Sequence, residues 1–242
     1  MLLPVLAKAK QKGSRATCMS DLKQLTTGFA MYTSDADDAY PAGASQNALG
    51  NQYEDWIAYQ NGAVPGANNT AGATPRPLSS GALAQYVPLT DDERQIEKSV
   101  YRCPSDNNWR QRTGAGGRPS YTFSYSFNSR GNNQGFSTYI NSGRTTISKF
   151  RTVQVQRPTD KFMVVEERQG AWDGSTLSWP NTTGGLIAGD PFWIDDGRWA
   201  GPGNVFTSIH NGKAVIGFAD SHVSILPYHG YTNVNAYDAR QQ

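Results

Sequence analysis

The chain has 242 residues, which is enough for one large domain or for a stem followed by a domain. Its formal net charge at pH 7 is only +2 and no Lys/Arg run interrupts the sequence, so the charge pattern excludes the footprint of a nucleic-acid-binding protein. Charged residues make up 17%, while 25 Gly and 13 Pro favour a loop-rich β domain, because these residues set turns.

Residues 2–34 are predicted to form one long helix. Apolar side chains recur along it at spacings of three and four and make one stripe that we expect to pack on the rest of the fold, whereas Asp21 is assigned to the polar face. The stripe consists of Cys18, Leu22, Leu25, Phe29 and Tyr32, and the last four are expected to bury against the sheet. The helix opens with a second apolar group, made of Leu2, Leu3, Val5, Leu6 and Ala9.

From residue 119 onward the apolar period becomes that of β-strands. Residues 121–127 alternate aromatic with Ser or Thr side chains, and residues 162–165 form an apolar run. Two further runs, 214–219 and 223–226, flank a turn and predict a β-hairpin. The sequence thus predicts an α+β fold, with a stem helix (1–34) packed on the antiparallel sheet of a globular head that has long insertions (35–242).

The two cysteines, Cys18 and Cys103, lie far apart in the sequence. In an oxidising compartment they would form a bridge worth about 4–5 kcal/mol by chain entropy. Two buried free thiols are the alternative. The sequence leaves both open.

Several segments resemble one family in the same order along the chain. Residues 1–10 and 17–25 are similar to the stem helix of type IV pilins and pseudopilins, in which an apolar half and a proline precede an amphipathic half. Further landmarks are Tyr40-Pro41, Cys103-Pro104-Ser105-Asp106, Pro119-Ser120-Tyr121, Arg157-Pro158-Thr159-Asp160-Lys161 and His210, which nine residues separate from Asp220. Nearly the whole chain resembles the pilin-like proteins with a His-x9-Asp-Gly motif near the C-terminus, although Ser221 stands where that family usually has glycine.

The resemblance implies a structural role and no enzymatic activity: a subunit of a type II secretion pseudopilus or of a type IV pilus-like filament. In that family the apolar stem sits in the inner membrane before assembly and packs at the filament centre afterwards, with other pilin-like subunits as partners. The head lies in the periplasm or outside the cell. The family's processing motif and most of its leading apolar stretch are missing here, and we expect residues 1–15 to project and to mediate assembly.

His210, Asp220 and His222 come nearest to a metal-binding or catalytic set. On a hairpin, His210 would precede the first strand while the other two flank the turn, and a seven-residue strand separates these ends by roughly 20 Å, too far for one metal ion. We therefore expect these residues to be structural. The sequence contains neither a nucleophile elbow nor a phosphate-binding loop, and no catalytic residue is predicted.

Glu166 and Glu167 end an apolar strand. Adjacent strand residues face opposite sides of a sheet, so these two carboxylates are not expected to act together as an acid and a base. We expect a salt bridge at the strand end, to a basic residue such as Arg168.

Two carboxylate clusters are candidate calcium sites, because calcium prefers oxygen ligands. The clusters are Asp35, Asp37 and Asp38, and Asp190, Asp195 and Asp196. Neither has the spacing of an EF-hand, and solvation of a helix exit also explains the first. No other cofactor is expected.

Four tryptophans belong to a Gly-rich excursion that spans residues 170–203. Exposed, they would bind sugars or a partner protein, and packed under their own loop they would form a small satellite core. They leave a second function open, that of a surface-displayed carbohydrate- or protein-binding module. The residues are Trp172, Trp179, Trp193 and Trp199.

Overall fold

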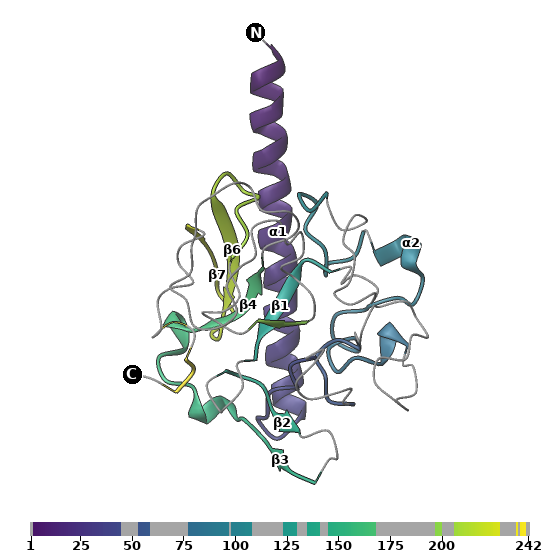
Figure 1. Ribbon diagram of the computed structural model, residues 1–242, viewed down its shortest axis with the longest axis vertical. Coiled ribbons are helices and arrows are strands. Elements are labelled where there is room, and N and C mark those ends of the chain that lie inside the picture. Colours follow the sequence, from purple (N-terminus) through teal and green to yellow (C-terminus); the bar gives the residue numbers. More distant parts are fainter. Residues whose placement is uncertain are drawn as a thin grey trace, which may run out of the picture.

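The structure is a computed structural model that describes residues 2–44, 53–58, 77–96, 98–107, 123–129, 135–140, 145–167, 197–199, 206–227, 236 and 238–240. Helix α1 (Leu2–Asp35) crosses the head, and its N-terminal turns stand clear of it (Figure 1). Pro4 lies in the first turn, where its missing N–H leaves no helical hydrogen bond unmade. The helix ends where Asp37 and Asp38 adopt positive φ angles of 55° and 61°, a left-handed conformation that cannot continue it.

A five-stranded sheet lies against α1 in the order β5-β1-β4-β6-β7. Its strands are β1 (Tyr125–Asn128), β4 (Phe162–Glu166), β5 (Arg198–Trp199), β6 (Lys213–Phe218) and β7 (Val223–Pro227). The α+β prediction is confirmed, and β6 and β7 form the predicted hairpin. The sheet is mixed, however, because β5 runs parallel to β1 while the other neighbours are antiparallel. The long connection between β1 and β5 permits this pairing, which a tight turn would forbid.

Shorter elements surround the sheet. Strands β2 (Tyr139–Ile140) and β3 (Ile147–Ser148) form a separate antiparallel pair near the C-terminal end of α1 (Figure 1). The short helices are α2 (Glu93–Ile96) and the 3₁₀ turns η1 (Leu78–Ser80), η4 (Thr152–Gln154) and η5 (Pro158–Asp160).

The two faces of the sheet bury different side chains, because successive strand residues point to opposite sides. Val164 of β4 and Val215 of β6 belong to the core shared with α1, whereas Val165 and Ile216 belong to a second core. The second core comprises Phe162, Val165, Trp199, Phe206, Ala214, Ile216, Phe218 and Ala236. The helix thus covers one face of the sheet, and among the described residues Phe206 and Ala236 pack on the other.

The C-terminal half of α1 supplies its apolar stripe to the first core. Leu22, Leu25 and Phe29 are fully buried, and Tyr32 packs partly buried against them. The ring of Phe29 stacks on Phe127 of β1 with centroids 4.6 Å apart. Each fully buried Leu or Phe side chain contributes about 1.5–3 kcal/mol through its removal from water. This burial fixes the helix on the sheet.

Helix and sheet approach one another closely at Gly217 of β6. A Cβ atom on this residue would lie 2.4 Å from Cγ2 of Thr26, closer than non-bonded carbon atoms allow. Thr26 is itself fully buried, and its hydroxyl donates to the carbonyl of Lys23 at 3.1 Å. The contact distance between α1 and β6 therefore requires glycine at position 217.

The turn of the β6–β7 hairpin docks on the same helix. Ser221 has a φ of 68°, in the left-handed region that favours glycine. The pilin-like family that this sequence resembles usually has a glycine at this position. Here Ser221 uses its side chain: its hydroxyl donates to the carbonyl of Thr26 at 3.2 Å, and its own carbonyl accepts from Nζ of Lys23 at 2.8 Å. These bonds tie the turn to the helix.

Replacing Gly217 by alanine should lower the free energy of unfolding by about 1–3 kcal/mol, because the added methyl group overpacks the contact with Thr26. Urea denaturation monitored by tryptophan fluorescence measures the change. A midpoint equal to that of the parent protein would contradict the close approach of α1 and β6.

Gly13→Ala is the matched control for this prediction. Gly13 lies in the exposed part of α1 and a Cβ there meets nothing within 4 Å, so alanine should not destabilise the protein and should favour the helix by up to about 1 kcal/mol.

Candidate functional site

The first turns of α1 form a projecting stem, defined here as residues 4–13, and every one of them is exposed. Val5 and Leu6 present 65% and 67% of their surface to solvent, and Ala9 is exposed beside them. Leu2 and Leu3 belong to the same helical segment. The stem thus displays the apolar side chains of Val5 and Leu6 to solvent. Among the helices of the described residues, none combines the length and the hydropathy needed to span a bilayer.

A disulfide between Cys18 and Cys103 joins the helix to the head at the point where α1 becomes buried. Both cysteines are buried, and the bond links residues 85 positions apart in the sequence. Of the two alternatives that the sequence left open, the bridge is confirmed. A structural disulfide points to an oxidising, extracytoplasmic environment.

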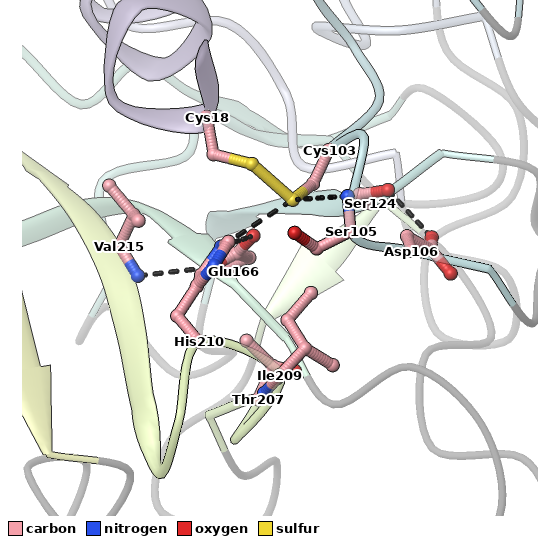
Figure 2. A network of polar contacts seen from close by, with 10 residues as sticks. All are labelled: Cys18, Cys103, Ser105, Asp106, Ser124, Glu166, Thr207, Ile209, His210 and Val215. Carbon is pink, nitrogen blue, oxygen red and sulfur yellow. Dashed lines mark hydrogen bonds and ion pairs between the residues drawn. A yellow bond between two sulfur atoms is a disulfide. The ribbon is translucent and has the colours of Figure 1, made fainter. Parts of the chain in front are cut away.

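Directly beside the disulfide lies a buried pair of ionisable side chains, Glu166 and His210 (Figure 2). Nε2 of His210 lies 3.0 Å from Oε1 of Glu166 and 3.5 Å from Sγ of Cys103. The backbone N–H of Val215 donates to the other oxygen, Oε2, of Glu166 at 2.9 Å. The carboxylate thereby connects β4, β6 and the segment before β6, next to the disulfide that holds the helix.

The ion pair expected at the end of this strand is formed with a distant histidine. The side chains of Glu166 and Glu167 are both buried, and Glu166 pairs with His210, which lies 44 residues further along the chain. Oε2 of Glu167 accepts from the hydroxyl of Ser126 at 2.7 Å, in line with the opposite faces expected for the two residues. Arg168, the expected partner, lies outside the described residues.

Asp21 was assigned to the polar face of α1, and the structure buries it. It lies three residues after Cys18, which places both on the same side of the helix. Burial, and secondarily the nearby carboxylate of Glu166, raise the pKa of Asp21 to about 7. Burial also raises the pKa of Glu166, although the bonds from His210 and Val215 act in the opposite direction. The helix therefore covers two carboxyl groups that resist ionisation.

Further polar contacts lie close to this cluster, where Asp106 of the Cys103 segment meets Ser124 (Figure 2). The side chains of Arg102 and Asp106 are buried, with Nη2 of Arg102 3.9 Å from Oδ2 of Asp106. The same Oδ2 accepts from the hydroxyl of Ser124 at 2.6 Å. These bonds fix the segment that carries Cys103 against the start of β1.

The two ends of the His-x9-Asp motif have separate partners, as the hairpin geometry predicted. His210 contacts Glu166, whereas Nδ1 of His222 lies 2.6 Å from Oδ1 of Asp220 at the turn. The His222 ring also stacks on Phe218 with centroids 4.0 Å apart. The motif residues therefore hold opposite ends of one hairpin and do not converge on one metal ion.

The first candidate calcium cluster does not assemble around a common point. The carboxylate of Asp35 accepts from the hydroxyl of Tyr86 at 2.7 Å, and that of Asp37 pairs with Lys149 at 3.4 Å. In the described part of the chain, the group whose donor atoms could together hold a metal ion is a different one, Cys18, Cys103, Glu166 and His210. The second cluster lies outside the described residues, at Asp190, Asp195 and Asp196.

The proposed tryptophan surface loses one of its members. Trp199 lies on β5, fully buried in the second core, with its ring 5.5 Å from that of Phe206. Its indole face is used for packing between the sheet and the following segment, so it cannot bind an external ligand. The other members, Trp172, Trp179 and Trp193, lie outside the described residues.

A basic pocket of about 290 Å³ opens beside the stem. One wall comes from α1 and carries Lys8, Lys12 and Arg15, and the other comes from the loop with His210 and Asn211. Cationic side chains thus line the junction between stem and head, next to the buried cluster.

Sequence reasoning missed the contact between His210, Glu166 and the disulfide. The sequence carries two weak signals for this cluster. The acidic side chain of Glu166 ends an apolar strand, and Asp21 lies on the same side of the helix as Cys18 and Leu25. Comparison with protein-family models, with curated proteins and with solved structures yields no match to this chain.

Asp21→Asn should remove a pH-dependent loss of stability. The pKa of Asp21 is about 7 in the folded protein, whereas the ordinary pKa of an aspartate is 3.8. The folded state therefore favours the protonated form. The parent protein should lose stability as the pH rises from about 4 through 7, whereas the variant should be more stable above pH 7 by about 1–2 kcal/mol after allowance for solvent screening. Urea denaturation at a series of pH values measures this.

Asp38→Asn is the control for the charge change itself. Asp38 is exposed and left-handed, a conformation that asparagine accepts, so this variant should keep the pH profile of the parent. Equal profiles for Asp21→Asn and the parent would show that Asp21 is ionised freely in the folded state.

Replacing both cysteines by serine should lower the free energy of unfolding by about 2–5 kcal/mol, because the unfolded chain regains the entropy of an 85-residue loop. Guanidinium denaturation of the two proteins measures the difference, and mass spectrometry with and without reductant verifies the bond. Unchanged stability, or free thiols in natively isolated protein, would contradict a structural role for the bridge.

Proposed function

We propose that this protein is a structural subunit of a pilin-like filament, of the type II secretion pseudopilus or type IV pilus kind, and not an enzyme. The observation that carries the proposal is the division of α1. Its C-terminal half forms the core of the head, while the stem of residues 4–13 is exposed and displays Val5 and Leu6. Exposed apolar side chains on an isolated helix favour burial against another surface. In a filament, the stems of neighbouring subunits or the membrane supply that surface.

The attachment of stem to head supports a role under mechanical load. A subunit pulled through its stem transmits force at the point where α1 enters the head, and a covalent bond from Cys18 to Cys103 lies at that point. Below it, Leu22, Leu25 and Phe29 anchor the helix by burial. A stem tied in this way would not be withdrawn from the head without rupture of the disulfide or of the core.

The proposed location follows from the same features. A disulfide forms in an oxidising compartment, which supports a head in the periplasm or outside the cell. The basic side chains Lys8, Lys12 and Arg15, at the junction of stem and head, suit the anionic surface of a membrane in which a pilin-like stem is held before assembly. The family resemblance of the landmarks from Tyr40-Pro41 to the His210–Asp220 pair agrees with this assignment.

Val5→Asp and Leu6→Asp should abolish incorporation into filaments in cells that produce the protein, because each places a charge in the apolar contact between stems. Electron microscopy of sheared surface material, with immunolabelling of this chain, measures incorporation. The thermal unfolding midpoint of the purified variants should be unchanged, since both positions are exposed.

Val153→Asp is the matched control, because Val153 is an equally apolar side chain that is 80% exposed on the head. This variant should enter filaments to a greater extent than the stem variants. Normal incorporation of Val5→Asp and Leu6→Asp, or the absence of this chain from any filament, would refute the proposal.

A further inference from the structure

The four residues around the disulfide combine the donor atoms of a metal site. Sγ of Cys18, Sγ of Cys103, a carboxylate oxygen of Glu166 and a ring nitrogen of His210 all lie within 4.8 Å of one another, and all four side chains are buried. They come from four places in the chain: α1, the Cys103 segment, β4 and the loop before β6. The fold thus brings two sulfurs, one imidazole and one carboxylate to a single point (Figure 2).

Their separations are close to those of a tetrahedral zinc site. Zinc bonds of about 2.3 Å to sulfur and about 2.0–2.2 Å to nitrogen and oxygen place neighbouring donors roughly 3.4–3.8 Å apart. Nε2 of His210 is already 3.5 Å from Sγ of Cys103 and 3.0 Å from Oε1 of Glu166. Once the bond between them is broken, the two sulfurs need to separate to about 3.7 Å, a movement that rotation of the cysteine side chains supplies.

Backbone N–H groups already bond two of the donor side chains, those of Cys103 and Glu166. The backbone N–H of Ser105 lies 3.4 Å from Sγ of Cys103, in a position to stabilise a thiolate. The backbone N–H of Val215 holds Oε2 of Glu166 and leaves Oε1 directed at the cluster. Groups of this kind fix the orientation of metal ligands and raise affinity. His210 also lines the 290 Å³ pocket beside the stem, so the cluster lies next to that pocket.

We propose that the disulfide is one of two states of this site, and that the reduced chain binds one zinc ion through Cys18, Cys103, Glu166 and His210. The mixture of thiolate, imidazole and carboxylate donors in a closed, four-ligand arrangement fits a structural zinc ion better than calcium or magnesium, which prefer six or more oxygens. This inference does not rest on the filament role. In either state the site joins α1 to the head, by the Cys18–Cys103 bond or by a metal ion.

The exchange between the disulfide state and the zinc-bound state is a two-electron reaction. A dithiol reductant gives two electrons and two protons to the Cys18–Cys103 bond, is itself oxidised to a disulfide, and leaves two thiols. Zinc then binds both sulfurs as thiolates and releases the two protons. In the reverse direction a disulfide oxidant takes two electrons from the thiolates, the sulfur–sulfur bond forms again, and zinc is released. Zinc would thus hold the helix in place in a chain that has not yet been oxidised.

The experiment uses the full chain, reduced anaerobically with a water-soluble phosphine, which becomes a phosphine oxide and does not compete strongly for zinc. Titration with zinc alone, against a colorimetric chelator, should give one tightly bound ion per reduced chain and none per oxidised chain. Cobalt in place of zinc should give the intense visible bands of a tetrahedral ion and the near-ultraviolet charge-transfer band of cobalt–thiolate bonds.

Two pairs of variants distinguish this site from other metal-binding groups. His210→Ala and Glu166→Gln should each weaken zinc binding by at least about 10-fold, because each removes one ligand. His222→Ala, which removes the turn histidine, and Glu167→Gln, which changes the neighbouring carboxylate, should bind as tightly as the parent. Cys18→Ser should abolish the cobalt–thiolate spectrum of a two-sulfur site.

Far-ultraviolet circular dichroism of each sample detects any unfolding that accompanies reduction. If the reduced chain unfolds, zinc should restore the folded signal of the parent protein but not that of His210→Ala. This recovery supports the site, as does zinc binding to a reduced chain that stays folded. A reduced parent protein that takes up no zinc, or that binds it equally well without His210 and Glu166, overturns the proposal.

Discussion

The structure depends on a helix that is much longer than the sheet beneath it. Helix α1 has 34 residues, or about 51 Å at 1.5 Å per residue. The longest strand packed on it, β6, has 6 residues and spans about 20 Å. A sheet of this size can bury only part of the helix, so residues 18–33 pack on the head while residues 4–13 stay exposed. The proposed assembly role rests on that mismatch.

The boundary between the buried and the exposed part of α1 is chemically the most unusual place in the protein. The disulfide, the Glu166–His210 pair and Asp21 are all buried there. Burial opposes ionisation of both carboxyl groups, and bonds from His210 and Val215 only partly compensate at Glu166. A cluster of this kind is a poor way to gain stability compared with apolar packing. It is well suited, however, to defining one register of the helix on the sheet, because few alternative positions would satisfy the same polar atoms.

Contacts between α1 and the β6–β7 hairpin also fix the position of the helix on the sheet. Gly217 allows the backbone of β6 to approach Thr26, and Ser221 ties the turn to the same residue. The positive φ of Ser221 explains why a glycine would suit this position, as in the resembling family. His210 and Asp220 hold the two ends of the hairpin through different partners. The spacing of the motif therefore reflects the length of one strand and not a shared catalytic site.

Local patterns in the sequence were sufficient for the long helix, for strands β1 and β4 and for the β6–β7 hairpin. The stripe of Leu22, Leu25 and Phe29 predicted the packed half of the helix, because helical periodicity depends only on neighbouring residues. The runs at 162–165, 214–219 and 223–226 predicted strands and a hairpin for the same reason. The two-residue strand β5 and its parallel pairing with β1 were not predictable, since they depend on a partner about seventy residues away in the chain, from Phe127 to Arg198.

The sequence by itself determined that this protein has a long amphipathic helix followed by an antiparallel hairpin and other strands, because those features are written in the spacing of apolar side chains. Only the tertiary structure decided that Cys18 bonds to Cys103, that Asp21 is buried and that Glu166 meets His210. The physical reason is that a charge or a thiol has no preferred partner until the chain folds. Its bonding and its burial are set by which distant segments the core brings within about 3–4 Å of it.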